Sequence, residues 1–392
     1  MKVLIAGAGL GGLCLAHGLM RQGVDVTVYE RDAALDSRGQ GYRLHLDAGL
    51  ALHSCLEPDL YELCVATAGR PSTSITFVTK RLRRIKQHSI DPPADPFDPA
   101  TLSTSVNRHT FREILAARLG DGVRYGKACT GFEQDGDGVV VSFADGSRAE
   151  GDVLVGADGV GSPVRRQYLP HAQVTGTGAL CVYGRTPLTS ETRPLIPDFL
   201  WRGFTGVIGR GVGMATGVLD FREEPRSAAK RIAPDVELTA VPSYLMWALT
   251  GPVHRFASDP AAASGPAAQS PAAQSPAELH RIVLDTIRRW HRDLRRLVEL
   301  AAVEETMLVP IRISVPVDPW PASRVTLLGD AIHAMSPARG SGANTALRDA
   351  ALLSAELGQA ARGDKKVLAA VAGYEREMTD YGFALVRANQ QV

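Results

Sequence analysis

Residues 1–31 read MKVLIAGAGLGGLCLAHGLMRQGVDVTVYER, and this stretch decides the fold. The apolar run at residues 3–6 predicts a buried strand, the periodicity of residues 13–20 predicts a helix, and residues 24–29 predict a second strand. A glycine-rich turn joins the first strand to the helix. Strand, glycine turn, helix and strand in this order are typical of a dinucleotide-binding βαβ unit.

The turn has the spacing G-x-G-x-x-G, formed by Gly7, Gly9 and Gly12. Gly7 allows the tight turn, Gly9 lets backbone amides approach a pyrophosphate, and Gly12 lets the helix pack closely on the strand. Leu10 and Gly11 open the helix, whose free N–H groups and positive dipole end favour an anion. We therefore predict that these five residues contact the dinucleotide.

An acidic residue follows the second strand. Glu30 can accept hydrogen bonds from an adenosine ribose, and an acid at this position favours an unphosphorylated ribose. Arg31 comes next, and Arg38 and Arg43 lie in the glycine-rich stretch RGQGYRLHL at residues 38–46. We expect these three arginines beside the cofactor, because a guanidinium suits phosphate recognition.

The composition narrows the class of protein. A chain of 392 residues with 45% apolar and 22% charged residues has room for two packed domains. The net charge of +1 gives no general attraction to nucleic acid or acidic membranes, and no apolar run reaches the roughly 20 residues that span a bilayer. The five cysteines lack C-x-x-C spacing and a metal-ligand pattern is absent, so we expect a cytoplasmic protein with reduced thiols and no metal.

The middle of the chain changes character. Residues 173–253 alternate between apolar and polar positions and are rich in valine, glycine and aromatic residues, which predicts one antiparallel sheet. Residues 258–276 repeat Pro-Ala-Ala-Gln-Ser and cannot bury a core, so we expect a surface loop. Residues 277–302 are amphipathic over their whole length and predict a single long helix.

Two further motifs make the prediction more specific. Residues 151–166 read GDVLVGADGVGSPVRR and include Asp158, and residues 324–354 read RVTLLGDAIHAMSPARGSGANTALRDAALLS. With the N-terminal motif, they resemble the three hallmark motifs of single-component FAD-dependent aromatic hydroxylases and monooxygenases, the para-hydroxybenzoate hydroxylase class. The chain looks closest to the tetracycline-modifying and antibiotic-tailoring branch. The resemblance covers the motifs well and is weaker across residues 173–277.

The resemblance implies an α/β fold. A Rossmann-like FAD-binding domain would carry an inserted antiparallel-sheet substrate domain and C-terminal helices. The expected parts are the FAD-binding domain at 1–72, 101–172 and 278–359, substrate-domain strands at 73–100, the substrate-binding sheet at 173–277 with its Pro/Ala-rich loop at 258–276, and a C-terminal helix at 360–392.

The third motif suits a flavin. Asp330 follows an apolar strand and can accept hydrogen bonds from the ribityl hydroxyls. Pro337 is rigid and lacks an N–H group, so it can shape a loop beside the ring. Gly340, Gly342 and Ala343 are small enough for the backbone to approach the ring edge. They open a helix whose positive end would face the negative charge of reduced flavin.

Other residues are assigned with the help of the resemblance. Gly329 precedes Asp330, and Asn344 could add an amide hydrogen bond to the flavin edge. Arg108 resembles the family arginine that reaches the pyrophosphate or ribityl chain. Asp158 is expected to bond backbone near the cofactor, and we expect His333 to support its loop rather than to act in catalysis.

The implied reaction is a monooxygenation. NAD(P)H, with NADPH favoured, would reduce FAD, and O2 would form a flavin hydroperoxide that passes oxygen to an aromatic or polyketide-like small molecule. Because the flavin does the chemistry, no catalytic side chain is assigned. We expect a monomer or homodimer with neither nucleic acid nor a membrane as partner. Alternation alone suggests eight substrate contacts, which are Tyr42, His45, Tyr183, Arg185, Trp201, Phe204, Met214 and Trp247.

Alternative outcomes on the same fold stay open. An epoxidase, a halogenase or a prenyl reductase would share the FAD-binding motifs, although the W-x-W-x-I-P motif of halogenases is absent from the sequence. A protein that binds FAD and a ligand without turnover is a further alternative. Oxidation of NAD(P)H that is stimulated by a ligand would separate an oxygenase from such a binding protein.

Overall fold

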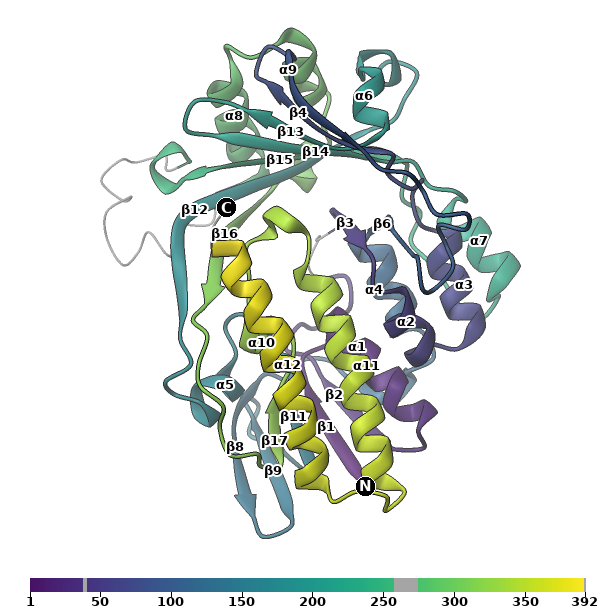
Figure 1. The fold of residues 1–392 in the computed structure, drawn as a ribbon, viewed down its shortest axis with the longest axis vertical. Helices are drawn as coiled ribbons and strands as arrows, with labels where there is room; N and C mark the ends of the chain where they lie inside the picture. The colour runs from purple at the N-terminus through teal and green to yellow at the C-terminus, as the bar shows by residue number, and fades with distance from the viewer. Residues whose placement is uncertain (38–40, 257–273, 391–392) are drawn as a thin grey trace.

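The computed structural model describes residues 1–37, 41–256 and 274–390, and it shows a two-lobed chain (Figure 1). The lower lobe in Figure 1 is built on a five-stranded sheet in which every neighbouring pair is parallel. Its strand order is β17 (Val325–Leu327), β11 (Val153–Gly156), β1 (Lys2–Ala6), β2 (Asp25–Tyr29) and β7 (Val123–Arg124). The apolar runs of β1, β11 and β17 are buried, as expected for strands covered on both faces.

Helices and a small second sheet cover this parallel sheet. Helix α1 (Leu10–Arg21) packs against α11 (Gly342–Ala361), which packs against α12 (Val367–Gln390). A three-stranded antiparallel meander contributes further residues to the same core. Its strands are β8 (Cys129–Asp135), β9 (Gly138–Phe143) and β10 (Arg148–Gly151). The predicted Rossmann-like lobe is confirmed.

The upper lobe is one seven-stranded sheet (Figure 1). Its order is β16 (Met307–Ser314), β12 (Val174–Pro187), β15 (Tyr244–Pro252), β14 (Gly213–Leu219), β13 (Gly203–Ile208), β4 (Ser74–Thr79) and β5 (Arg84–Ser89). Neighbouring strands are antiparallel except for β13 and β4, which are parallel. The predicted antiparallel sheet is therefore present. It includes β4 and β5, which lie within the segment 73–100 to which the sequence analysis assigns substrate-domain strands, and it also takes in β16 at residues 307–314.

The two faces of this sheet have separate cores. The outer face, which carries Val182, Met214 and Trp247, packs under the helices of the upper lobe. Those helices are α6 (Asp198–Trp201), α8 (Pro276–Ile287) and α9 (Arg292–Glu299). The inner face carries Tyr183 and Tyr244 together with other residues of a smaller core. It is turned toward the lower lobe in Figure 1.

Residues 276–314 differ from the prediction in two ways. Most of the segment packs on the seven-stranded sheet, through α8, α9 and the pairing of β16 with β12, whereas the sequence analysis assigns residues from 278 onward to the FAD-binding domain. The expected single helix at 277–302 is also two helices. The chain breaks at His291, whose N–H donates to the carbonyl of Lys80 and whose Nδ1 caps α9 by accepting from Asp293 N. Most of the predicted loop at 258–276 lies outside the described residues.

Asn107 joins the two lobes. It ends β6 (Thr104–Asn107), which pairs with β3 (Arg43–Leu46), and its Oδ1 caps α4 (Arg108–Ala116) by accepting from His109 N and Thr110 N. Its Nδ2 donates to the carbonyl of Gly41 at 2.8 Å and to the hydroxyl of Tyr244 at 3.1 Å. One buried amide thus fixes the start of a helix, a loop and a strand of the inner face.

Several smaller elements complete the chain. They are α2 (Gly49–Cys55), α3 (Pro58–Ala66), α5 (Pro163–Tyr168), α7 (Pro225–Ile232), α10 (Asp330–His333), and the 3-10 turns η1 (Gly120–Gly122), η2 (Arg193–Leu195), η3 (Val253–Arg255), η6 (Val303–Glu305) and η7 (Pro337–Arg339). All five cysteines are unpaired. Within residues 1–37, 41–256 and 274–390, no helix is long and apolar enough to cross a bilayer, and no cluster of His, Cys, Asp or Glu could hold a metal.

A buried acid links α12 to the parallel sheet. Glu375 is buried, and its Oε1 accepts a hydrogen bond of 2.8 Å from the hydroxyl of Thr326 in β17. Burial raises the pKa of Glu375 to about 7, against the stabilising effect of Thr326 and Trp320 on the charged form. Between pH 4.5 and 7 the unfolded chain loses this proton while the folded chain keeps it. The free energy of unfolding therefore falls across this window and stays lower above it.

We predict that Glu375→Gln stabilises the protein at pH 8 but not at pH 4.5. The amide keeps the uncharged form, so the gain at pH 8 should be about 1–3 kcal/mol in the free energy of unfolding. Urea unfolding at both pH values measures it. Glu377→Gln, at an exposed position of the same helix, is the matched control. Equal behaviour of the two variants would contradict this account.

Candidate active site

The glycine-rich turn has the predicted conformation. Gly7 has a φ of +113°, and a Cβ there would lie 2.3 Å from the carbonyl oxygen of Ala157. A Cβ on Gly12 would lie 2.1 Å from the carbonyl oxygen of Gly7, so both positions require glycine. Gly9 precedes α1 without a side-chain cap, and a Cβ there would meet nothing within 4 Å. The first N–H groups of α1 thus border open space at Gly9.

The next two residues of the turn pack rather than face this space. Leu10 is buried in the core of the lower lobe. A Cβ on Gly11 would lie 2.4 Å from Leu328 Cδ2 and 3.1 Å from Ala346 Cβ. Because Ala346 is in the first turns of α11, the N-terminal ends of α1 and α11 lie against each other.

The side chain of Glu30 fixes the conformation of the glycine-rich turn through hydrogen bonds. Its Oε2 accepts from Ala8 N at 2.8 Å, and its Oε1 accepts from Asp32 N at 3.0 Å. Arg112, which the sequence analysis missed, forms an ion pair with Glu30 at 3.7 Å and donates from Nε to the carbonyl of Ala8 at 2.9 Å. Burial lowers the pKa of Arg112, and the charge of Glu30 opposes this effect. Both side chains are almost fully buried.

The third motif presents an exposed acid beside a helix end. Gly329 adopts a φ of +62°, and Asp330 begins α10 with an exposed side chain. A Cβ on Gly342, the first residue of α11, would lie 3.8 Å from Asp330 Oδ1. Desolvation of the carboxyl by the surrounding protein raises the pKa of Asp330, while the charges of His333 and Arg108 lower it. Asp330 and Arg108, which are far apart in sequence, therefore lie close enough for their charges to interact.

The loop before α11 is open to solvent at its tip. Pro337 is exposed, and Gly340 has the left-handed φ of +65° that ends the 3-10 turn η7. Ser341 precedes α11 without capping it, so the first N–H groups of α11 have no side-chain partner there. Ala343, in the first turn, is half-buried against the core of the lower lobe. These positions suit the approach of a ligand to the helix end.

Asn344 departs from the prediction. Its Nδ2 donates to the carbonyls of His45 at 3.0 Å and Gly340 at 3.2 Å, and its Oδ1 accepts from Asp47 N at 2.9 Å. Both amide protons are used, so the expected amide hydrogen bond to the flavin is not available from this side chain. Asn344 instead ties the end of β3 to the loop before α11.

His333 supports the loop, as expected. It is fully buried, and its Nε2 lies 2.6 Å from Oδ2 of Asp349 in α11. Asp349 also accepts from Gly329 N at 2.9 Å and from the hydroxyl of Tyr381 at 2.5 Å. Burial acts to lower the pKa of His333, but the charge of Asp349 outweighs it and the pKa is raised. This network fixes the turn that carries Asp330.

Asp158 has one orphaned oxygen. Its Oδ2 accepts from Val164 N at 3.3 Å, whereas its buried Oδ1 has no partner among the described atoms. Burial raises the pKa of this carboxyl. Asp158 N also lies 2.9 Å from the position of a Cβ on Gly7, so this acid sits beside the glycine-rich turn. Asp158 thus accepts a hydrogen bond from the backbone, as expected, and its Oδ1 remains as an acceptor for a ligand.

The four predicted arginines have different surroundings. Arg108 begins α4, and its guanidinium lies 5.8 Å from the centre of the Tyr42 ring. Arg31 is exposed, and Arg38 lies outside the described residues. Arg43 does not point to the glycine-rich turn: its Nε donates to the carbonyl of Val218 in β14 at 3.3 Å, because alternation along β3 turns it toward the upper lobe.

Five of the eight predicted substrate contacts surround the inner face. Tyr42 stacks on Tyr183 with ring centres 4.9 Å apart. Arg185 forms an ion pair with Glu305, and its guanidinium lies 5.3 Å from the centre of the Tyr244 ring. Phe204 contacts Phe77 edge to face. His45 on β3 completes the five, since a Cβ on Gly340 would lie 3.4 Å from its Cβ.

The other three belong to the outer core, which corrects the prediction. Met214 and Trp247 are fully buried under α8 and α9, and Trp201 packs against the same core with its Nε1 donating to the carbonyl of Ile196. Alternation assigns residues to two faces of a strand. It does not say which face is covered by helices, so residues of both faces entered the prediction.

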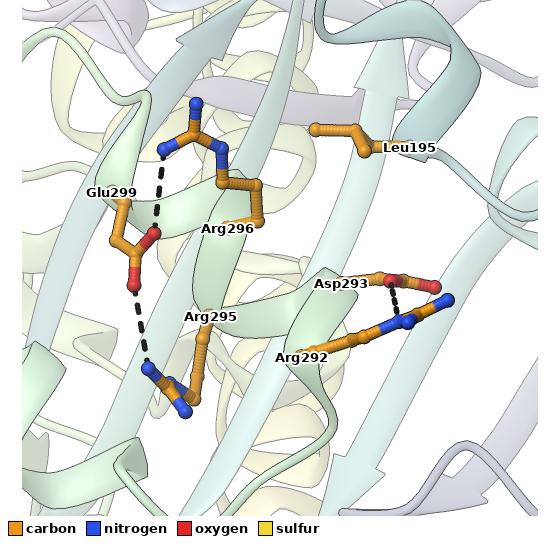
Figure 2. Close-up of a pocket in the computed structure, with 6 residues that line it drawn as sticks. All are labelled: Leu195, Arg292, Asp293, Arg295, Arg296 and Glu299. Carbon is orange, nitrogen blue, oxygen red and sulfur yellow. Dashed lines mark ion pairs between the residues drawn. The ribbon is translucent and has the colours of Figure 1, made fainter.

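A hollow of about 350 Å³ on the helical side is a separate feature (Figure 2). In it, Glu299 forms ion pairs with Arg295 and Arg296, and Arg292 pairs with Asp293. Leu195 completes the lining. Each of its five charged side chains is in an ion pair, although the three arginines outnumber the two acids, and none of the predicted site residues lines the hollow.

Residues 1–195 and 283–389 match the FAD binding domain family. The chain belongs to this family. It is 30% identical over 408 residues to the FAD-dependent monooxygenase thnD of Trichoderma harzianum, covering 100% of this chain and 92% of that protein. It is 33% identical to the dual O-methyltransferase/FAD-dependent monooxygenase CTB3 of Cercospora beticola, covering 96% of this chain but 44% of that protein. The chain thus spans less than half the length of CTB3.

A solved structure agrees with this membership. Klebsiella pneumoniae HpxO, complexed with FAD and uric acid, superposes with a TM-score of 0.73 at 25% identity, covering 100% of this chain and 87% of HpxO. FAD is accordingly the cofactor of this family member. The open space at Gly9, the orphaned oxygen of Asp158 and the exposed Asp330 fit a ligand with phosphates at one end and hydroxyl groups further along.

We predict that Arg112→Gln destabilises this FAD-binding chain by about 3 kcal/mol, because it leaves the buried carboxylate of Glu30 unpaired. Chemical unfolding measures the loss, and FAD affinity should fall with it as the turn loosens. Arg376→Gln, an exposed arginine on α12, is the control. A loss no larger than that of the control would contradict the role given to Arg112.

Proposed function

We propose that the chain is an FAD-dependent monooxygenase that uses NAD(P)H and O2 to hydroxylate or otherwise oxygenate an aromatic or polyketide-like small molecule. The observation that carries the proposal is the pair of adjoining helix N-termini, of α1 and α11, with exposed Asp330 beside the second. The inner face of the seven-stranded sheet, with its aromatic side chains, lies across from them.

The chain's own residues have defined tasks in this proposal. The N–H groups after Gly9 would bind the pyrophosphate, and Glu30 would keep the turn in shape. Asp330 would accept hydrogen bonds from the ribityl hydroxyls, with Arg108 on the same side. The N-terminus of α11 would favour negative charge at the flavin edge. When bound, FAD supplies the redox chemistry by accepting electrons from NAD(P)H and delivering them to O2.

The inner face would bind and orient the substrate. Tyr42, Tyr183 and Phe204 offer aromatic surface, which suits stacking on an aromatic ring. The sheet would also shield the reacting atoms from water, and exclusion of water from a site limits side reactions. The unpaired thiols suit a reducing compartment, so the proposal places the enzyme in the cytoplasm, acting as a monomer or homodimer.

We predict that the purified protein is yellow, with one FAD per chain, and oxidises NAD(P)H faster when an aromatic substrate is present. Gly9→Trp should abolish FAD binding, because the side chain fills the open space at the helix end. Gly176→Trp in β12 is a matched control, since Gly176 also borders open space. Absorbance near the flavin bands measures occupancy. A colourless wild-type protein that takes up no added FAD would refute the proposal.

We also predict that Ala343→Asp lowers the flavin midpoint potential. A carboxylate at the first turn of α11 opposes the negative charge of reduced flavin by about 1–2 kcal/mol. This corresponds to roughly 20–40 mV for two electrons. Spectroelectrochemical titration gives the potential. Ala361→Asp at the other end of α11, about 27 Å away at 1.5 Å per residue, should leave it unchanged. An unchanged potential in Ala343→Asp with FAD bound would mean that this helix does not face the flavin.

A further inference from the structure

Arg43 is a guanidinium without an acidic partner. Its Nε donates to the carbonyl of Val218 at 3.3 Å, and no other hydrogen bond of its side chain is seen among residues 1–37, 41–256 and 274–390. Within the same residues, no carboxylate lies at ion-pair distance from it. Burial lowers the pKa of Arg43 to about 10, so the group is still positively charged at neutral pH. A charge in such surroundings is costly unless a counter-ion approaches it.

The inner face leaves room for this guanidinium. A Cβ on Gly217 in β14 would lie 3.1 Å from both Cζ and Nη1 of Arg43. The neighbouring inner-face position on β14 is Ala215, another small residue. The guanidinium therefore packs against a strand whose inner-face positions carry small residues, and a larger residue at 217 would push it away.

The charges around Arg43 do not neutralise it. Arg185 is another cation of the inner face, and Glu305 already pairs with it. Tyr244 faces both arginines, but its phenol is uncharged at neutral pH, since burial raises its pKa to about 12. Asp47, just after β3, has its Oδ2 3.5 Å from Nε2 of His45, and it forms no ion pair with Arg43 in the part of the chain that the structure describes. One positive charge is left without compensation.

Arg43 lies between the loop before α11 and the seven-stranded sheet. Residues two apart on a strand point to the same side and are about 7 Å apart, so Arg43 and His45 share one side of β3. Leu44 and Leu46 point the other way, into the core of the lower lobe. His45 adjoins Gly340 of the loop before α11, and Arg43 adjoins Gly217 of the inner face. A molecule bound between them would meet the guanidinium.

We propose that Arg43 is a substrate-binding residue and that the substrate is an aromatic anion, a carboxylate or phenolate whose negative oxygens pair with this guanidinium. The inference rests on the proposed function and names its substrate class. A planar guanidinium can donate two parallel hydrogen bonds to such a group, which also fixes the orientation of the ring to which the group is attached. Arg43 thus selects the anionic form and sets which edge of the ring faces the flavin.

The test compares acids with their neutral amides. 2-Hydroxybenzoate, 1-hydroxy-2-naphthoate and 3-hydroxy-2-naphthoate, each paired with the corresponding amide, are titrated into the FAD-loaded protein, and the change in flavin absorbance gives each Kd. We expect at least one acid to bind tenfold or more tightly than its amide, tenfold being about 1.4 kcal/mol. Arg43→Gln should remove this preference. Arg43→Lys should keep part of it, because lysine keeps the positive charge but cannot donate two parallel hydrogen bonds from one planar group.

Two further variants make the result specific. Gly217→Ala keeps the charge but crowds the guanidinium, and it should weaken acid binding more than amide binding. Arg83 is an exposed arginine on the β4–β5 turn, and Arg83→Gln should change neither acid binding nor amide binding. FAD content and basal NAD(P)H oxidation are measured on every variant. If the wild type lacks both, the proposed monooxygenase function fails. A wild-type protein that has both but binds no acid, or binds acids and amides equally, overturns the inference about Arg43 and leaves the proposed function standing. The same holds if Arg43→Gln keeps the full preference for acids.

Discussion

The geometry of the cofactor end depends on one peptide unit, that of Ala8. Its N–H donates to Glu30 and its carbonyl accepts from Arg112, and these two side chains form a buried ion pair with each other. Glycines stand on both sides of Ala8, so the turn would otherwise be free to adopt many conformations. An acid from the end of β2 and a base from α4 remove this freedom. The first N–H groups of α1 are left unpaired and held in place.

The second helix end is positioned from the first. Gly11 allows α1 to pack against Ala346 of α11, and the His333–Asp349 pair fixes the turn between β17 and α11. Asp349 also accepts from Gly329 N, so the same carboxylate that orients His333 shapes the turn before Asp330. The polar groups that a flavin would meet are thus supported by buried side chains that it would not touch.

The sequence was most informative where function requires a local spacing. The G-x-G-x-x-G turn, Glu30 and the Gly329–Asp330 turn are each defined within a few residues, because sterics and backbone hydrogen bonding act over that range. Arg112 was missed for the opposite reason. It lies on an amphipathic helix, where a charged residue is normally assigned to solvent, and only the tertiary position of Ala8 and Glu30 makes its burial favourable. Asn344 was assigned to the wrong partner because its carbonyl acceptors, at His45 and Gly340, come from a strand and a loop that sequence alone does not bring together.

The seven-stranded sheet shows a different limit. Its strands carry apolar residues on both faces, since α8 and α9 bury one face and the lower lobe covers the other. Hydrophobicity therefore cannot distinguish Trp247 from Tyr183, although one is core and the other faces the cofactor lobe. Polar residues make the distinction. Arg43 and Arg185 lie at the inner face, and no helix amphipathicity or strand pairing requires a guanidinium there. Side chains that the fold does not need, placed where two lobes meet, are the part of the molecule in which the choice of substrate can change without loss of the cofactor site.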